Sequence, residues 1–233
     1  MRCTAHANSY PFISPYAYAL NTPTNAIDPD GKDVYLVIWA TSDGEVGHAG
    51  IAVENYKTIE LYGPNGEYGG VITVPDGTFT YYDLWPNNDE GVGVTNANSD
   101  VEAYYGEKIT TLKDITTTDV TGAEGRLPDG VIKLTTDYVT DGKTKAALKE
   151  FKEKNTNYNG VQCNCSDYAE EGIETAAGKQ LDVNEDILNI YNSTTPNKLY
   201  QETSKLPNAV ILIDAGNKVD KTFVEGAKES GGN

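Results

Sequence analysis

Histidine and cysteine are scarce in this chain of 233 residues, which has only two histidines and three cysteines. Any mechanism that needs an imidazole must therefore use His6 or His48. Two histidines exclude a zinc site of the histidine-rich type, and a mixed cysteine and histidine site would have to be assembled from scattered positions. We accordingly expect no metal ion and no other cofactor.

Positive charge is also in short supply. The sequence has 18 lysine and arginine residues against 35 aspartate and glutamate residues, which gives a formal net charge of −17. A chain this acidic is repelled by phosphate backbones, so the composition argues against a nuclease and against any nucleic-acid partner. No apolar run approaches the length of a membrane span, and the N-terminus lacks the pattern of a secretory signal peptide.

The three cysteines do not suggest a disulfide framework. Their number is odd, and Cys163 and Cys165 are separated by a single residue, which strains a disulfide between them. A reactive thiol is the more informative possibility. Cys165 directly precedes a predicted helix at 166–178, where unpaired N–H groups and the helix dipole would stabilise a thiolate. Cys163 lies outside this helix, and the alternative for Cys165 is a buried core cysteine.

His48 lies in GHAGIAV (47–53), a segment with the alternation of a β-strand. On one face of that strand His48 is followed by a glycine and an alanine, whose small size would allow a helix to approach closely. The next segment, YKTIELY (56–62), also has the composition of a strand. We therefore predict a hairpin that turns near residues 54–55.

Two acidic residues are candidates to orient this histidine. In the predicted hairpin, Glu60 would lie opposite His48 and on the same face. A carboxylate beside an imidazole orients the ring and stabilises its charged form. Asp83, in the predicted neighbouring strand TFTYYDL (78–84), is the alternative acid. Without catalysis, the same residues would be an exposed histidine beside a solvated glutamate.

The rest of the chain predicts an α+β fold, with strands in the first half and helices in the second. Residues 144–155 combine strong helix formers with an apolar stripe, and Gly178 would end the helix that follows Cys165. Further strands are predicted at 34–40, 70–74, 101–107 and 209–214, with a turn at 75–77, and shorter helices at 183–191 and 196–203.

The N-terminal segment carries a motif of its own. SPYAY (14–18) is followed by P-x-x-x-x-D-P-x-G, formed by Pro23, Asp28, Pro29 and Gly31. This stretch resembles the end of the core domain of Rhs/YD-repeat proteins, where a conserved shell gives way to a variable C-terminal effector, often a toxin. The resemblance implies a bacterial effector that is secreted or delivered to another cell, with a dedicated immunity protein as partner. The alternative is an ordinary turn rich in proline and aspartate.

A second resemblance concerns the histidine and cysteine segments. GHAGIAVENYKTIEL (47–61) resembles the histidine-bearing hairpin of NlpC/P60 and LRAT-type enzymes, and YNGVQCNCSDYAEEGI (158–173) resembles their cysteine helix. Histidine before cysteine is the circularly permuted order of that superfamily. The resemblance implies a papain-like fold, an antiparallel sheet with packed helices, one of which bears the cysteine.

This second resemblance also implies residue roles and a range of substrates. Cys165 would be the nucleophile and His48 the base, with Glu60 or Asp83 as the orienting acid. NlpC/P60 relatives cut peptidoglycan peptides, LRAT-type relatives act on lipid acyl groups, and some papain-like toxins modify proteins. We expect amide hydrolysis in peptidoglycan through a thioester intermediate, with lipid or protein substrates and acyl transfer as alternatives.

The sequence thus divides into a leader (1–33), a papain-like domain (34–215) and a flexible tail (216–233). Two other functions are considered beside the cysteine hydrolase. One is a nuclease toxin, against which the net charge argues. The other is a binding module with a catalytically inactive papain-like fold.

Overall fold

A computed structural model describes residues 33–41, 47–87, 98–187 and 191–220 of the chain. All of the predicted leader except Asp33 lies outside the described residues, as does most of the predicted tail. The first residues of that tail, Gly216–Asp220, form a short 3-10 helix.

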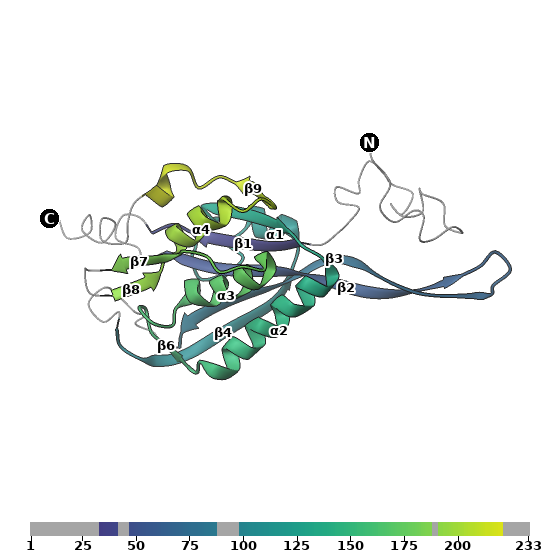
Figure 1. Cartoon of the computed structure of the whole chain (residues 1–233), viewed down its shortest axis with the longest axis horizontal. Coiled ribbons are helices and arrows are strands. Elements are labelled where there is room, and N and C mark those ends of the chain that lie inside the picture. The colour runs from purple at the N-terminus through teal and green to yellow at the C-terminus, as the bar shows by residue number, and fades with distance from the viewer. Residues whose placement is uncertain (1–32, 42–46, 88–97, 188–190, 221–233) are drawn as a thin grey trace. The chain divides into compact units, whose positions relative to one another are not determined.

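Seven strands form one antiparallel sheet, in the order β6-β4-β3-β2-β1-β5-β9 (Figure 1). These strands are β1 (Asp33–Trp39), β2 (His48–Tyr62), β3 (Tyr68–Pro86), β4 (Val101–Thr110), β5 (Gly130–Thr135), β6 (Asn157–Tyr158) and β9 (Ala209–Ile213). A separate two-stranded sheet pairs β7 (Asn184–Ile187) with β8 (Tyr191–Thr194). With the helices described below, the fold of the described residues is α+β, as the sequence predicts.

β1 is central to the core because both of its faces are apolar. Val34 and Leu36 belong to one buried cluster, whereas Tyr35 and Trp39 belong to another on the opposite face of the sheet. A short and continuous apolar run is the pattern expected of a strand that is covered on both sides. The segment DVYLVIW is such a run, and every residue in it is buried.

Three helices cover the first of these faces, which we call the helix face (Figure 1). They are α2 (Tyr138–Lys154), α3 (Cys165–Ala177) and α4 (Pro196–Ser204). Each contributes a fully buried aliphatic side chain to the cluster of Leu36, namely Leu148, Ile173 and Leu199. This packing fixes α3 against the sheet and so positions Cys165.

The second face, which we call the Trp39 face, is covered by the chain between β4 and β5. Ile115 of α1 (Leu112–Thr117) and Val120 are buried in the same cluster as Trp39. The Trp39 indole N–H donates a hydrogen bond of 3.0 Å to the carbonyl of Arg126. This contact fastens the covering segment to the sheet.

The hairpin predicted at 47–62 is wrong, because β2 continues through this segment without a turn. Asn55, at the expected turn, is instead bonded across to β3. Its side chain donates to Thr78 Oγ1 at 3.1 Å and accepts from Thr80 Oγ1 at 2.9 Å. β3 is likewise one continuous strand, so the turn predicted at 75–77 is also wrong.

The turn between β2 and β3 lies farther along the chain. The Gly63 N–H donates to the Glu67 carbonyl at 2.7 Å, and the Gly66 N–H donates to the Gly63 carbonyl at 2.9 Å. Gly66 has a φ of 82°, a left-handed conformation that favours glycine. Residues 56–76, the outer parts of both strands, belong to a unit separate from the one that holds the rest of the sheet. We call these residues the arm.

Several other elements lie where the sequence predicts them, among them β1, β4, α3, α4 and β9. α2 begins at Tyr138 rather than at 144, because the Asp137 side chain caps it by accepting from the Thr140 N–H at 2.6 Å. The helix predicted at 183–191 is wrong, since this segment contributes to β7 and β8. None of the described helices is long and apolar enough to cross a membrane.

Candidate active site

Asn164 and Asp167 cap the N-terminus of α3, at the turn that carries Cys165. The Asn164 side chain accepts hydrogen bonds from the N–H groups of Ser166 at 2.7 Å and of Asp167 at 3.2 Å. The Asp167 carboxylate accepts in return from the Asn164 N–H at 2.8 Å. This capping box makes Cys165 the first helical residue, and Gly178, with a φ of 66°, ends the helix. Both helix ends confirm the prediction.

Burial, rather than the helix terminus, governs the protonation of the Cys165 thiol. The residue is only 6% exposed. Desolvation raises its pKa to about 11, although the nearby Ala49 N–H acts in the opposite direction. Burial also raises the pKa of Cys163 to about 11. The expected thiolate is therefore not the resting state of this conformation, in which Cys165 is protonated at neutral pH.

His48 is the first residue of β2 and pairs with Trp39 on β1. Its ring is stacked on Trp85, with centroids 3.9 Å apart and planes 15° apart. The side chain is buried, and Nε2 has no hydrogen-bond partner among the described residues. Burial lowers the pKa of His48 to about 3, so the ring is neutral at physiological pH. A neutral imidazole can accept a proton, but a pKa this far below neutral makes it a weak base in the resting structure.

Asp83 of β3 is the carboxylate beside this imidazole. Its Oδ2 lies 3.9 Å from His48 Nε2, a distance that allows an electrostatic contact but is too long for a hydrogen bond. Gly106 faces Asp83 on β4, where any Cβ would overlap the carboxylate. Burial raises the pKa of Asp83, whereas a hydrogen bond from Trp85 and the charge of Lys108 lower it. The structure thus brings His48 and Asp83 together.

Glu60, the other candidate acid, lies elsewhere. It is on β2 itself, within the arm, and not on a strand opposite His48. Its carboxylate accepts a hydrogen bond of 2.6 Å from the Tyr62 hydroxyl. The prediction that Glu60 faces His48 is therefore wrong. It depended on a turn at 54–55, and alternation alone does not distinguish one long strand from two short ones.

The thiol and the imidazole approach the start of β2 from different sides. His48 contacts Trp39 on the Trp39 face, whereas the apolar side chains of α3 pack on the helix face. Cys165 meets the strand at the N–H of Ala49, the residue that follows His48. A negative charge on the Cys165 sulfur also acts on the Trp39 face, because it raises the pKa of the Tyr81 hydroxyl there. No hydrogen bond joins the thiol to the imidazole among the described contacts.

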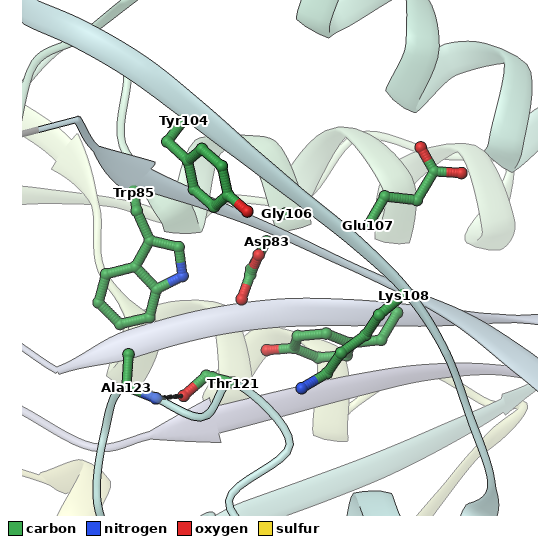
Figure 2. Close-up of a pocket in the computed structure, with 9 residues that line it drawn as sticks. Asp83, Trp85, Tyr104, Gly106, Glu107, Lys108, Thr121 and Ala123 are labelled. Atoms are coloured by element: carbon green, nitrogen blue, oxygen red, sulfur yellow. Dashed lines mark hydrogen bonds between the residues drawn. The ribbon is translucent and has the colours of Figure 1, made fainter.

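A pocket of about 370 Å³ opens beside Asp83 on the Trp39 face. Figure 2 shows the Asp83 carboxylate surrounded by the side chains of Trp85, Tyr104 and Lys108. The pocket is lined by Tyr81, Asp83, Trp85, Tyr104, Gly106, Glu107, Lys108, Thr121 and Ala123. No group of three potential metal-ligating side chains occurs in the part of the chain that the structure describes.

Sequence reasoning identified Asp83 but missed its neighbours Tyr81 and Trp85. The signal is the alternation within TFTYYDLWP, which places these three residues on one strand face. The β4 residues of the pocket could not be found in this way, because their position depends on the pairing of β4 with β3. In that pairing Tyr104 lies opposite Trp85 and Lys108 lies opposite Tyr81.

Comparison with protein-family models, with curated proteins and with solved structures produced no match.

Proposed function

We propose that the chain is a papain-like cysteine hydrolase or acyltransferase in which Cys165 is the nucleophile, His48 the base and Asp83 the orienting acid. One observation carries this proposal. A neutral imidazole, held between a carboxylate at 3.9 Å and a stacked indole, occupies the strand position next to the N–H that Cys165 approaches. Burying an imidazole and a carboxylate side by side costs desolvation free energy, and a catalytic role would account for that cost.

The proposed reaction starts from a neutral thiol and a neutral imidazole. His48 takes the proton from Cys165 as the sulfur attacks the substrate carbonyl, and Asp83 stabilises the imidazolium that forms. The tetrahedral intermediate collapses to a thioester, and the leaving amine or alcohol receives the proton from His48. Water, or an acceptor alcohol or amine, then attacks the thioester with His48 again as base, and the acid, ester or amide product leaves the restored thiol.

This reaction requires a movement of the Cys165 side chain. In the resting structure the sulfur is buried at the Ala49 N–H, and the imidazole lies on the other side of the sheet. The thiol and the imidazole therefore have to approach each other at the start of β2, where His48 and Ala49 are neighbours. We propose that substrate binding drives this movement, because catalytic hydrogen bonds often tighten only in the substrate complex.

The substrate and the biological setting are also proposals. The Rhs-like leader supports delivery as a bacterial effector, with an immunity protein as its partner. The similarity of the two motifs to those of NlpC/P60 enzymes supports an amide of a peptidoglycan peptide as the substrate. Intact sacculi incubated with the protein would be analysed by mass spectrometry for released or shortened peptides. We expect new products with the wild type and with Cys163→Ser, and none with Cys165→Ser.

A binding domain without catalytic activity is the second candidate. It is favoured by the raised pKa of the Cys165 thiol and by the lack of a hydrogen bond between this thiol and His48 in the described structure. If this candidate is right, sacculi, lipids and proteins will give the same mass spectra after exposure to the wild type and to Cys165→Ser.

A further inference from the structure

The pocket beside Asp83 has an excess of negative charge. Asp83 lines it and Lys108 is the one cation in its lining, whereas the Glu107 carboxylate points to the helix face, where it acts on Tyr82. Asp119, on the covering segment, also acts on the pocket, because its charge raises the pKa of Asp83. These charges favour a cationic ligand over an anionic one.

Aromatic rings form much of the pocket wall. Tyr81, Trp85 and Tyr104 all line it, and Tyr104 is 57% exposed at the rim. The faces of such rings attract cations, most strongly when the cation is removed from water. The Lys108 ammonium already lies 6.0 Å from the centroid of the Tyr81 ring. The position of Lys108 thus indicates that these aromatic walls accept a cation.

One buried group of the pocket lining has no partner in the protein. Tyr81 is 1% exposed, and its hydroxyl has no hydrogen-bond partner among the described residues. The Asp83 carboxylate is also buried and accepts hydrogen bonds from Trp85 and from the Gly106 N–H, but the imidazole 3.9 Å away is neutral and does not balance its charge. A buried polar atom without a partner destabilises a protein, so the unpaired Tyr81 hydroxyl indicates a ligand atom in the pocket.

We infer that this pocket binds a primary ammonium group on a flexible alkyl chain, with Asp83 and Tyr81 as its hydrogen-bond acceptors. An ammonium has three N–H donors, and a carboxylate and a phenolic oxygen accept two of them. A quaternary ammonium has no donor and would leave the Tyr81 hydroxyl unpaired. The alkyl chain would leave the pocket past Trp85 and Tyr104. Lysine side chains of peptides and free diamines share this chemistry.

The two tryptophans of the chain provide a direct test. Trp85 lines the pocket, whereas Trp39 is buried with its indole N–H bonded to Arg126. In the full chain labelled with ¹⁵N-tryptophan, the indole signals report ligand binding and fold integrity separately. The probe is Nα-acetyl-lysine amide, and its control is Nα-acetyl-norleucine amide, which lacks the ammonium. Comparison with 1,5-diaminopentane distinguishes a peptide ligand from a free amine.

We expect the lysine probe to shift the Trp85 signal in a saturable manner while the Trp39 signal stays in place. Asp83→Asn should weaken binding by about tenfold or more, since it removes the charge of a buried pair. Glu153→Gln, which removes a charge from the exposed surface of α2, should leave the dissociation constant within about twofold. Lys108→Met should tighten binding, because it removes the competing cation.

The inference is overturned if the Trp85 signal does not move at any soluble probe concentration, or if the norleucine probe shifts it equally. Tighter binding to Lys108→Met supports the inference even if Asp83→Asn fails to fold. The assay measures binding without turnover, so it is independent of the proposed catalysis. Cys165→Ala should bind the probe as the wild type does.

Discussion

The start of α3 and the pocket beside Asp83 lie on opposite sides of one sheet and are built in opposite ways. At the start of α3, Asn164 and Asp167 satisfy each other and the first helical N–H groups, and only the buried Ser166 hydroxyl of that turn is left with the Cys165 sulfur as its partner. At the pocket, His48 Nε2 and the Tyr81 hydroxyl are buried without partners among the described residues. The first arrangement stabilises a rigid terminus, whereas the second leaves hydrogen-bonding capacity for a ligand or a reacting group.

The largest expected effect tests the packing of the helix face. A Cβ at Gly172 would overlap Ile51 Cδ1 and lie 3.2 Å from Leu148 Cδ2. Gly172→Val should therefore lower the free energy of unfolding by about 3 kcal/mol. Gly142→Val is the matched control, because Gly142 is an exposed glycine of α2 with open space around its Cα. Urea denaturation of both variants checks the difference, and equal stability would show that α3 does not pack closely on β2.

The next largest effect is the pH dependence of stability that His48 causes on the Trp39 face. The pKa of His48 is lowered to about 3 in the folded state from 6.5, so the unfolded state binds the proton first as the pH falls. The stability that neutral His48 contributes to the folded state is fully present above pH 6.5, and it is lost as the pH falls from 6.5 toward 3. Between pH 7.5 and 4.5 this loss is on the order of 2 kcal/mol, and His48→Gln should remove it from the pH profile of stability.

A carboxyl on the helix face gives the opposite slope and serves as the control. Burial raises the pKa of Glu170 from 4.5 to about 7, and its Oε2 accepts a hydrogen bond of 2.6 Å from Thr194. The folded state therefore binds the proton more readily, and this contribution is lost as the pH rises from 4.5 through 7. Glu170→Gln should make stability fall more steeply on acidification than in the wild type. Parallel profiles of the two variants would contradict this account.

A smaller loss of stability is expected when the N-terminal cap of α3 is removed. Asn164→Ala removes the acceptor for two backbone N–H groups and a buried partner of the Ser193 hydroxyl at 3.0 Å. We expect a loss of about 1.5 kcal/mol in the free energy of unfolding. Asn164→Asp retains the acceptor, so thermal denaturation should show it to be the more stable of the two variants. The reverse order would mean that burying a second carboxylate beside Asp167 costs more than the cap contributes.

The smallest effect distinguishes the two acids. Glu60 is on the arm and bonds only locally to Tyr62 in the contacts described above. Glu60→Gln should therefore leave the rate of Cys165 acylation unchanged. Asp83→Asn should slow it by about tenfold or more, because it removes the charge beside the imidazolium. Equal rates in Asp83→Asn and the wild type would remove Asp83 from the proposed mechanism.

The features that the sequence predicted well are local. The start of α3 follows from the residues around Asn164, and its end from Gly178, because caps and C-terminal glycines act within a few residues. The burial of β1 likewise follows from its own apolar run. The same local reasoning identified Cys165 and His48 as the unusual residues of the chain.

The features that it predicted badly depend on partners far away in sequence. The position of the turn at 63–67 decides which carboxylate meets His48. The glycines and proline of residues 63–66 are a stronger turn signal than residues 54–55, which contain neither, so this error could have been avoided. The pKa of Cys165 depends on what buries the thiol, which the helix start does not reveal. The pocket exists only because β3 pairs with β4. No local pattern contains the burial of the thiol or the pairing of β3 with β4.

Acetylation of Cys165 by p-nitrophenyl acetate tests the central claim most directly. The Cys163→Ser background leaves one thiol in the peptide that contains both positions, so tandem mass spectrometry of quenched samples measures the thioester at Cys165 alone. We predict rapid acetylation in this background and its near-complete loss when His48→Gln is added. Equal acetylation with and without His48 would contradict the account, because the thiol would then react without the imidazole as its base.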